Sequence, residues 1–323
     1  MSIISVILFI ISILGVLAVS AYLNRIQYKI KVFEKAIMTV SNNTSSLSNN
    51  SGTSLEEPAL ISVKAIHSGD IKLPLSNPLN LKHPACSGIQ NKNVVIPIFA
   101  YLIHHIKYGY FLIDSGCEDS YVNDPYGPMK GLILQSVMPK TILDPGQAID
   151  RQLIAEKNNI KGVFFTHLHF DHTSGIKALP GDILYIAGEG EESISIKWLI
   201  EPNHFNRQAV VYLFDFNSEE AFDHPIGKAV DVFGDNTLLA ISTPGHSKGH
   251  VSYIVNTKDH PVLISGDAVI LNKSIELGAG PGTSSKNIKS AQKTFEKIRE
   301  YLKNNPETEL WPGHDFSISR LQL

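Results

Sequence analysis

The sequence has little cysteine, little net charge and no visible internal repeat. Only two of its 323 residues are cysteines, which excludes a disulfide-dense scaffold and a zinc cluster built on thiolates. Lysine and arginine number 28 against 31 acidic residues, and this balance argues against a basic nucleic-acid-binding surface. The absence of a solenoid-length repeat argues against a stacked-repeat protein. With 43% hydrophobic and 18% charged residues, most of the chain can bury a core.

The N-terminus carries one long uncharged stretch. The 21 residues from Ile3 to Leu23 contain no charge, and a helix of that length spans a bilayer core of roughly 30 Å. Residues 1–24 are therefore expected to form a transmembrane anchor or signal segment. The basic residues follow the stretch, beginning with Arg25, which favours a retained single-pass anchor with the bulk of the chain in the cytoplasm. Small residues up to Ala21 leave open the alternative of export after signal cleavage near that residue.

The remaining chain divides into a linker and a folded body. Residues 25–57 are expected to hold a short amphipathic helix over Arg25–Val40 and then a flexible Ser/Asn-rich tract over Ser41–Ser54. Residues 58–323 predict one α/β domain, with a helix over Lys286–Asn304 whose apolar residues are spaced three and four apart. Apolar runs of strand length predict strands over Ala59–Ala65, Val94–Ile103, Gly109–Ile113, Val163–Thr166, Ile183–Ile186, Val210–Phe214, Thr237–Ile241, Val251–Val255, Val262–Ile264 and Glu309–Trp311.

A dense group of histidines follows the run that ends at residue 166. Residues two apart in an extended segment point the same way, so His167 and His169 can hold one ion together. Where the chain turns into a helix, Asp171 and His172 are directed to a neighbouring point. Three imidazoles and one carboxylate within six residues predict metal binding, by zinc first, with iron or manganese as alternatives.

Three further candidates each follow an apolar strand. His246 stands in Thr-Pro-Gly-His, Asp267 in Ser-Gly-Asp and His314 in Pro-Gly-His. Taken singly, each motif is a turn or a cap. Ligands at strand ends gather at one edge of an α/β fold, however, and the neighbouring glycines allow the backbone to turn sharply there. A site that holds two metal ions needs about this number of further ligands.

These motifs resemble the metallo-β-lactamase-fold hydrolase superfamily, over roughly Ala59 to His314. The resemblance implies a four-layer αββα sandwich, with two mixed sheets face to face and helices outside. It also implies a small-molecule substrate. By motif, it assigns His167, His169 and His246 to a first metal ion, Asp171, His172 and His314 to a second, and Asp267 to the position that bridges them.

The chemistry that two such ions imply is hydrolysis. Two divalent cations that share a hydroxide lower its pKa and direct it at a lactone, ester or thioester carbonyl. Asp267 and Asp171 are the candidate catalytic carboxylates, Asp267 by fixing the metal spacing and Asp171 by also moving a proton. Asp114, in an early Asp-Ser-Gly turn, is read as structural or supporting. A phosphodiesterase on the same metals and a non-hydrolytic metal-binding module remain the alternatives.

Within the superfamily, the pattern is most similar to the compact acyl-homoserine-lactone lactonase-like branch. The bridging position holds Asp267, where the common β-lactamases have Cys or Ser. The stretch Pro-Gly-His-Ser-Lys-Gly-His, which ends at His250, is similar to the Pro-Gly-His-x-x-Gly-His of lactonases. One departure is Ile270, because the best-known lactonases carry a substrate-binding tyrosine there. We therefore expect either a different hydrogen-bond donor or a different substrate.

Two long insertions are expected either to line the pocket or to pack onto the body. The first is Glu118–Ile142, with Tyr121, Tyr126, Met129 and Met138, and the second is Gly188–His224, with Trp198, Phe205 and Phe222. The oligomeric state and the roles of Cys86 and Cys117 stay open.

Overall fold

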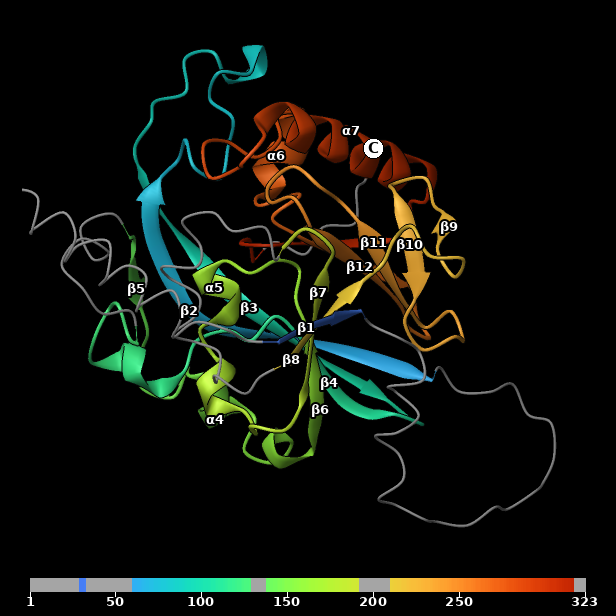
Figure 1. Cartoon of the computed structure of the whole chain (residues 1–323). Coiled ribbons are helices and arrows are strands. Elements are labelled where there is room, and N and C mark those ends of the chain that lie inside the picture. The colour runs from blue at the N-terminus through green and yellow to red at the C-terminus, as the bar shows by residue number, and fades with distance from the viewer. Residues whose placement is uncertain (1–28, 33–59, 129–137, 192–209, 317–323) are drawn as a thin grey trace, which may run out of the picture.

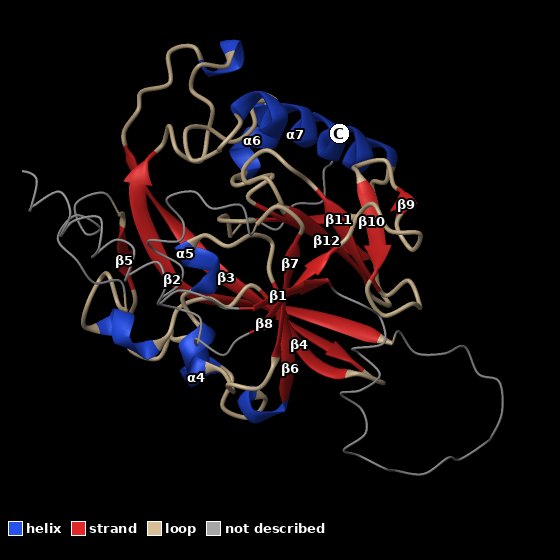
Figure 2. Cartoon of the chain, viewed as in Figure 1, coloured by secondary structure: helices blue, strands red, loops and turns tan. Residues whose placement is uncertain are grey.

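The computed structural model describes residues 29–32, 60–128, 138–191 and 210–316. Two β-sheets form its centre, and the helices lie at the periphery (Figure 1, Figure 2). In spatial order, the eight-stranded sheet consists of β1 (Lys29–Val32), β8 (Val210–Phe214), β7 (Leu184–Gly188), β6 (Ile160–Phe164), β4 (Gly109–Ile113), β3 (Asn93–His105), β2 (Ile61–Pro74) and β5 (Lys140–Ile142). The six-stranded sheet consists of β14 (Glu309–Pro312), β13 (Pro261–Gly266), β12 (Val251–Asn256), β11 (Leu238–Ser242), β10 (Lys228–Asp231) and β9 (Phe222–Asp223).

Both sheets are mixed. In the first, β2, β3 and β4 pair antiparallel, whereas β4, β6, β7 and β8 run parallel. In the second, β10 to β13 pair antiparallel, and β14 joins β13 in parallel. The prediction of two mixed sheets is therefore confirmed.

Apolar residues on the facing sides of the sheets form one buried core. The first sheet contributes Ile103 and Phe164, which are fully buried, and the second contributes Tyr253 and Ile264. Burial of this kind contributes roughly 25 cal/mol per Å² of apolar surface, so the contact between the sheets is a main source of stability.

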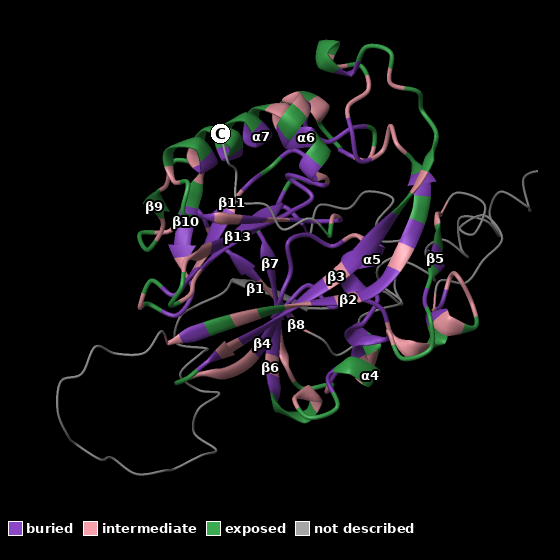
Figure 3. Ribbon diagram, turned by 180° about the vertical axis from the view of Figure 1, so that it is seen from behind, coloured by how far each residue is buried: buried purple, intermediate pink, exposed green. Residues whose placement is uncertain are grey.

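Helices cover the outer faces of the sheets. The helices α4 (Ile149–Gln152) and α5 (Phe170–Thr173) lie beside the first sheet, and α6 (Asn272–Leu277) and α7 (Ile288–Asn304) cover the second (Figure 1). Buried residues of α7 pack against that sheet, while its other side is exposed (Figure 3). The order is helix, sheet, sheet, helix, as the αββα prediction requires. Four short 3₁₀ helices complete the described elements: Pro84–Cys86, Asp119–Val122, Lys157–Asn159 and Ile176–Ala178.

The helix predicted over Arg25–Val40 is wrong for Lys29–Val32, and the other residues of that range lie outside the described residues. Lys29–Val32 forms β1, which pairs in parallel with Val210–Leu213 of β8. Its sequence Lys-Ile-Lys-Val alternates polar and β-branched residues, a period of two that suits a strand, and β8 offers an open edge. No helix within the described ranges is long and apolar enough to cross a membrane, and the predicted anchor over Ile3–Leu23 lies outside those ranges.

Candidate metal centre

The histidine-rich motif lies in the loop that joins β6 to α5. The backbone of His169 is extended, and His169 Nδ1 lies 2.8 Å from His167 Nε2, so the two imidazoles lie side by side. The helix α5 begins at Phe170, and its first turn carries Asp171 and His172. The change from extended chain to helix therefore divides the motif between two neighbouring points, as the sequence predicts.

The three later residues reach the same place from the second sheet. His246 follows β11, Asp267 follows β13 directly, and His314 follows β14. Two glycines allow the close approach. A Cβ at Gly313 would lie 2.7 Å from Asp267 Oδ1, and a Cβ at Gly245 would lie 2.3 Å from a backbone nitrogen of α7. Only glycine fits such positions without a shift of the surrounding atoms.

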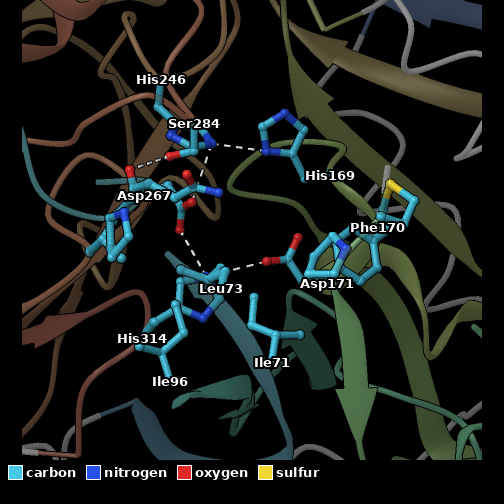
Figure 4. A pocket seen from close by; sticks show the side chains of 15 residues that line it. Ile71, Leu73, Ile96, His169, Phe170, Asp171, His246, Asp267, Ser284 and His314 are labelled. Carbon is cyan, nitrogen blue, oxygen red and sulfur yellow. Dashed lines mark hydrogen bonds and ion pairs between the residues drawn. The ribbon is translucent and has the colours of Figure 1, made fainter. Parts of the chain in front are cut away.

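The seven side chains form two neighbouring groups, and Asp267 lies between them. The first consists of His167, His169, His246 and Asp267, and the second of Asp171, His172 and His314; within each, the ligand atoms lie within 4.8 Å of one another. Asp267 stands between the groups, with its Oδ2 3.2 Å from His246 Nε2 and its Oδ1 3.2 Å from His314 Nε2 (Figure 4). The structure thus brings together all seven residues selected from the sequence.

The donor set fits two divalent cations. His172 Nε2 and Asp267 Oδ1 are buried and make no hydrogen bond with any described residue, although they lie 3.4 Å apart. Burial lowers the pKa of His167 well below its usual range, which leaves the imidazole neutral and able to donate a lone pair. Burial opposes ionisation of Asp267, but the imidazoles of His246 and His314 hold its pKa well below the usual range. Neutral imidazole with ionised carboxylate is the set that zinc, iron and manganese take.

A buried carboxylate orients His172 from behind. Asp114 Oδ2 accepts from His172 Nδ1 at 2.7 Å and from Thr166 Oγ1 at 2.9 Å, and its Oδ1 accepts from the Thr166 backbone at 2.8 Å. This contact leaves Nε2 of His172 directed at the cluster. The His314 ring is fixed in the same way, because its Nδ1 donates to the Pro97 carbonyl at 2.6 Å. Asp114 belongs to neither group of ligand atoms.

Comparison with known proteins identifies the family. Residues 94–314 match the sequence model of the Metallo-beta-lactamase superfamily. The chain belongs to this superfamily. It is 28% identical over 229 residues to the N-acyl homoserine lactonase AttM of Agrobacterium fabrum, covering 68% of this chain and 82% of that one. It is 27% identical over 225 residues to the cytoplasmic hydroxyacylglutathione hydrolase of Arabidopsis thaliana, covering 67% of each chain.

Solved structures with the same fold include two lactone hydrolases. An N-acyl homoserine lactone hydrolase with the product N-hexanoyl-L-homoserine at its catalytic metal centre gives a TM-score of 0.58 at 19% identity, over 80% of this chain and 95% of that one. AidC, a dizinc quorum-quenching lactonase, gives 0.55 at 11% identity, over 80% and 89%. The predictions of the superfamily, and of a hydrolase that resembles lactonases, are confirmed.

One supporting residue of this superfamily member was not found from its sequence. Glu191 is 4% exposed, and its two oxygens accept from the backbone N–H of Leu168 at 2.9 Å and of Gly249 at 3.0 Å. Leu168 lies between the first two histidines of the motif, and Gly249 lies in the loop between β11 and β12 that carries His246. The carboxylate therefore ties together the loops that carry the first group of ligand atoms. The surrounding sequence, Gly-Glu-Gly-Glu, contains no pattern that would mark Glu191 as a residue that supports the metal ligands.

His250 supports Asp267 through the backbone. Its Nε2 accepts from the Asp267 N–H at 3.0 Å, and its Nδ1 lies 2.8 Å from Thr243 Oγ1. Burial lowers the pKa of His250 to about 4, so the ring is neutral and can accept this hydrogen bond. These contacts give His250 a structural role behind the bridging carboxylate.

A cavity of about 240 Å³ opens beside the cluster. It is bounded by Asp171, Asp267 and three of the histidines, and otherwise mostly by apolar side chains (Figure 4). The apolar lining consists of Ile71, Leu73, Pro78, Ile96, Met138, Pro139, Phe170 and Ile270. Ile270, at the lactonase tyrosine position, is only 2% exposed, and its side chain has no hydrogen-bonding group. The polar lining residues outside the cluster are Asn77 and Ser284.

The insertions contribute to the site unequally. Met138 lines the cavity, whereas Tyr121 is buried in the body with its hydroxyl 2.9 Å from Ser174 Oγ. Tyr126 packs against the same apolar cluster as Tyr121, and Phe222 lies on β9 away from the cavity lining. The other residues singled out from the insertions, Met129, Trp198 and Phe205, lie outside the described residues.

Proposed function

We propose that the chain hydrolyses a lactone that carries an apolar acyl substituent. The observation that carries this proposal is the cavity: a cluster of metal-ligand type forms one wall, and hydrocarbon side chains form most of the rest. An apolar wall favours an acyl chain through burial and offers little to a highly charged substrate. The similarity to AttM supports the same substrate class.

The two groups of ligand atoms would hold two divalent cations, with zinc as the first candidate. His167, His169 and His246 would hold one cation and Asp171, His172 and His314 the other, with Asp267 between them. Bound cations of this kind supply Lewis acidity toward a carbonyl oxygen and toward water. Burial lowers the pKa of His167, so this ring can bind a cation in its neutral form. Although burial opposes it, the carboxylate of Asp114 raises the pKa of His172 and that of Asp267 raises the pKa of His314, so these two rings would release a proton when a cation binds.

The chain itself would position the substrate and handle the proton. Water adds its oxygen to the lactone carbonyl carbon, the ring C–O bond breaks, and the departing alkoxide takes one proton to give a hydroxy acid. Asp171 lies on the cavity wall, where its carboxyl can pass that proton. Burial raises the pKa of Asp171, which suits a group that holds a proton briefly.

Asn77 would replace the missing lactonase tyrosine as a hydrogen-bond donor. Its Oδ1 accepts from Thr283 Oγ1 at 2.9 Å, and its backbone carbonyl accepts from Ser284 Oγ at 2.8 Å. The amide oxygen is thus engaged, which leaves the amide N–H₂ of Asn77 as the side-chain group to bind a substrate oxygen. This assignment gives Ile270 the role of an apolar contact for the acyl chain.

A substrate panel tests the proposal. We expect the metal-loaded full-length chain to hydrolyse N-hexanoyl homoserine lactone with a higher kcat/KM than unsubstituted γ-butyrolactone. Only the former has an acyl chain that can pack against the apolar lining of the cavity. A thioester, a β-lactam and bis-p-nitrophenyl phosphate complete the panel. Turnover of the phosphodiester alone, or equal rates on both lactones, would contradict the proposal. Less than one equivalent of bound transition metal would contradict the whole scheme.

We also propose that residues 1–24 anchor the chain in a membrane, with residues 58–323 on the cytoplasmic side. The uncharged run Ile3–Leu23 and the basic residues after it support this topology. A reporter that is active only after export, fused to the C-terminus, should be inactive. Activity of that reporter would instead support export after cleavage near Ala21. No nucleic-acid partner is proposed, since the net charge is only −3.

A further inference from the structure

A second cavity, of about 320 Å³, lies where the loop after β11 meets the start of α7. Two segments line it, and their residues are Pro244, Gly245, Ser247, Lys248, Lys286, Asn287 and Ser290. None of these residues belongs to the seven-residue cluster, and none lines the cavity beside it. The cavity is therefore a separate feature of the surface.

The lining is positively charged. Lys248 and Lys286 are exposed, no acidic residue lines the cavity, and neither lysine makes an ion pair with a described residue. The stem of Lys248 passes close to Gly190, where a Cβ would lie 3.0 Å from Lys248 Cγ. The 17-residue helix α7 starts beside the lysines, and Asn287 caps it by accepting from the Ser290 N–H at 3.0 Å. The N-terminal end of such a helix attracts anions.

A buried hydroxyl in the lining has no partner. Ser247 is 1% exposed, and its Oγ makes no hydrogen bond with any described residue. Leaving a buried hydroxyl unpaired is unfavourable, so a ligand that accepts from it would gain affinity. The surrounding pentapeptide, Gly245–Gly249, matches the Gly-x-Ser-x-Gly pattern of serine nucleophiles. No described imidazole makes a hydrogen bond with Ser247 Oγ, however, so the geometry does not form a catalytic triad.

Backbone contacts hold the two segments together and preform the cavity. The Lys286 N–H donates to the His246 carbonyl at 2.8 Å, and the Asn287 N–H donates to the Gly245 carbonyl at 3.0 Å. Thr294 Oγ1, in the second turn of α7, donates to the Pro244 carbonyl at 2.7 Å. Because these bonds fix the loop on the helix, little ordering is required when a ligand binds.

We propose that this cavity binds the phosphate group of a small phosphorylated molecule or free phosphate. Lys248 and Lys286 would neutralise its charge, and Ser247 Oγ would donate to one oxygen. Phosphate carries close to two charges at neutral pH and accepts hydrogen bonds on several oxygens, which matches two ammonium groups and a hydroxyl better than a carboxylate does. The proposal does not depend on the lactone substrate.

Titration calorimetry on the full-length chain tests this site. The chain is first freed of metal by dialysis against a chelator, because phosphate could otherwise bind at metal ions. Inorganic phosphate and glycerol 3-phosphate are the two probes, and tighter binding of the second would identify a phosphorylated organic molecule as the ligand. The variant K248A/K286A should weaken phosphate binding by at least about tenfold, because it removes both positive charges. S247A should weaken it by about tenfold, because a hydrogen bond to a charged group contributes about this much to affinity. The matched control K293A/K297A removes two exposed lysines from α7 outside the cavity and should change affinity less than about twofold.

The outcomes separate the proposal from its alternatives. Loss of binding in K248A/K286A with retention in K293A/K297A supports it, and S247A provides a second test that leaves both charges in place. Equal losses in the two double variants would show a general charge effect and overturn the site. Binding that appears only with metal restored, or no binding of either probe at millimolar concentration, would also overturn it.

Discussion

Replacing Asp114 by asparagine removes a negative charge from behind His172 while keeping the side chain's shape. Asp114 has a backbone φ of 55°, a left-handed conformation that asparagine tolerates better than alanine does. Its carboxylate receives three hydrogen bonds, from His172 Nδ1 and from the backbone and hydroxyl of Thr166. Asparagine has one acceptor oxygen, so at least one of these donors must lose its partner.

Two magnitudes follow from this geometry. A lost hydrogen bond between charged, buried groups costs about 1.5–3 kcal/mol, so D114N should destabilise the metal-free chain by that amount in urea unfolding. A carboxylate that orients a histidine ligand typically contributes about 10–100-fold to metal affinity. We therefore expect D114N to weaken binding of one of the two cations by about 10–100-fold in competition with a chromophoric chelator.

Asp235 provides a matched control elsewhere in the fold. Its Oδ2 lies 2.9 Å from Nε2 of His105, a fully buried histidine outside the ligand cluster. D235N removes an Asp–His contact of the same kind and should cost stability without changing metal affinity. If D114N retained both cations as tightly as D235N does, the argument that Asp114 orients His172 for metal binding would be refuted.

Three further predictions concern single side chains. E191Q should weaken binding of one cation about tenfold in the same chelator competition, because an amide cannot accept from both the Leu168 and the Gly249 N–H. N77A should lower kcat/KM for an acyl lactone by about tenfold or more, measured by pH-stat, if its amide binds the substrate carbonyl. F295A should destabilise the chain by about 3–5 kcal/mol in urea unfolding, because Phe295 is fully buried between α7 and the second sheet.

Neighbouring residues supply controls for the first two. Glu189 is exposed two residues before Glu191, so E189Q makes the same chemical change and should leave metal affinity unaltered. T283A removes the hydroxyl that donates to Asn77 Oδ1, together with a methyl group, but keeps the Asn77 amide, so it should change kcat/KM much less than N77A. Equal effects of variant and control would remove the assigned role in each case.

The sequence predicted the elements whose patterns are local. The strands over Gly109–Ile113 and Val210–Phe214 have the bounds expected from their apolar runs. The spacing of apolar residues over Lys286–Asn304 correctly predicted α7 and its buried face. The His-x-His-x-Asp-His motif revealed the site because so many ligand-type side chains within six residues have no purpose in packing.

Features that depend on distant contacts could not be predicted in this way. Glu191 acts through two backbone N–H groups, at Leu168 and Gly249, which any residue type can provide, so no residue pattern marks it. Lys29–Val32 is too short to signal a strand strongly, and its pairing with β8 is a tertiary contact. Likewise, no residue pattern indicates that the Pro97 carbonyl accepts the hydrogen bond that fixes the His314 ring.

The seven-residue cluster depends on how the two sheets pack. Four of its residues, from His167 to His172, follow β6 of the first sheet, whereas His246, Asp267 and His314 follow strands of the second. Each group of ligand atoms contains residues from both sides, so neither can form before the sheets meet. Cations that bind only the assembled cluster must stabilise the packed sandwich by mass action. Three groups outside the cluster hold its ligands in place: the carboxylate of Glu191, the ring of His250 and the Pro97 carbonyl. The cavity beside the cluster is apolar at Ile270, where the best-known lactonases offer a tyrosine hydroxyl.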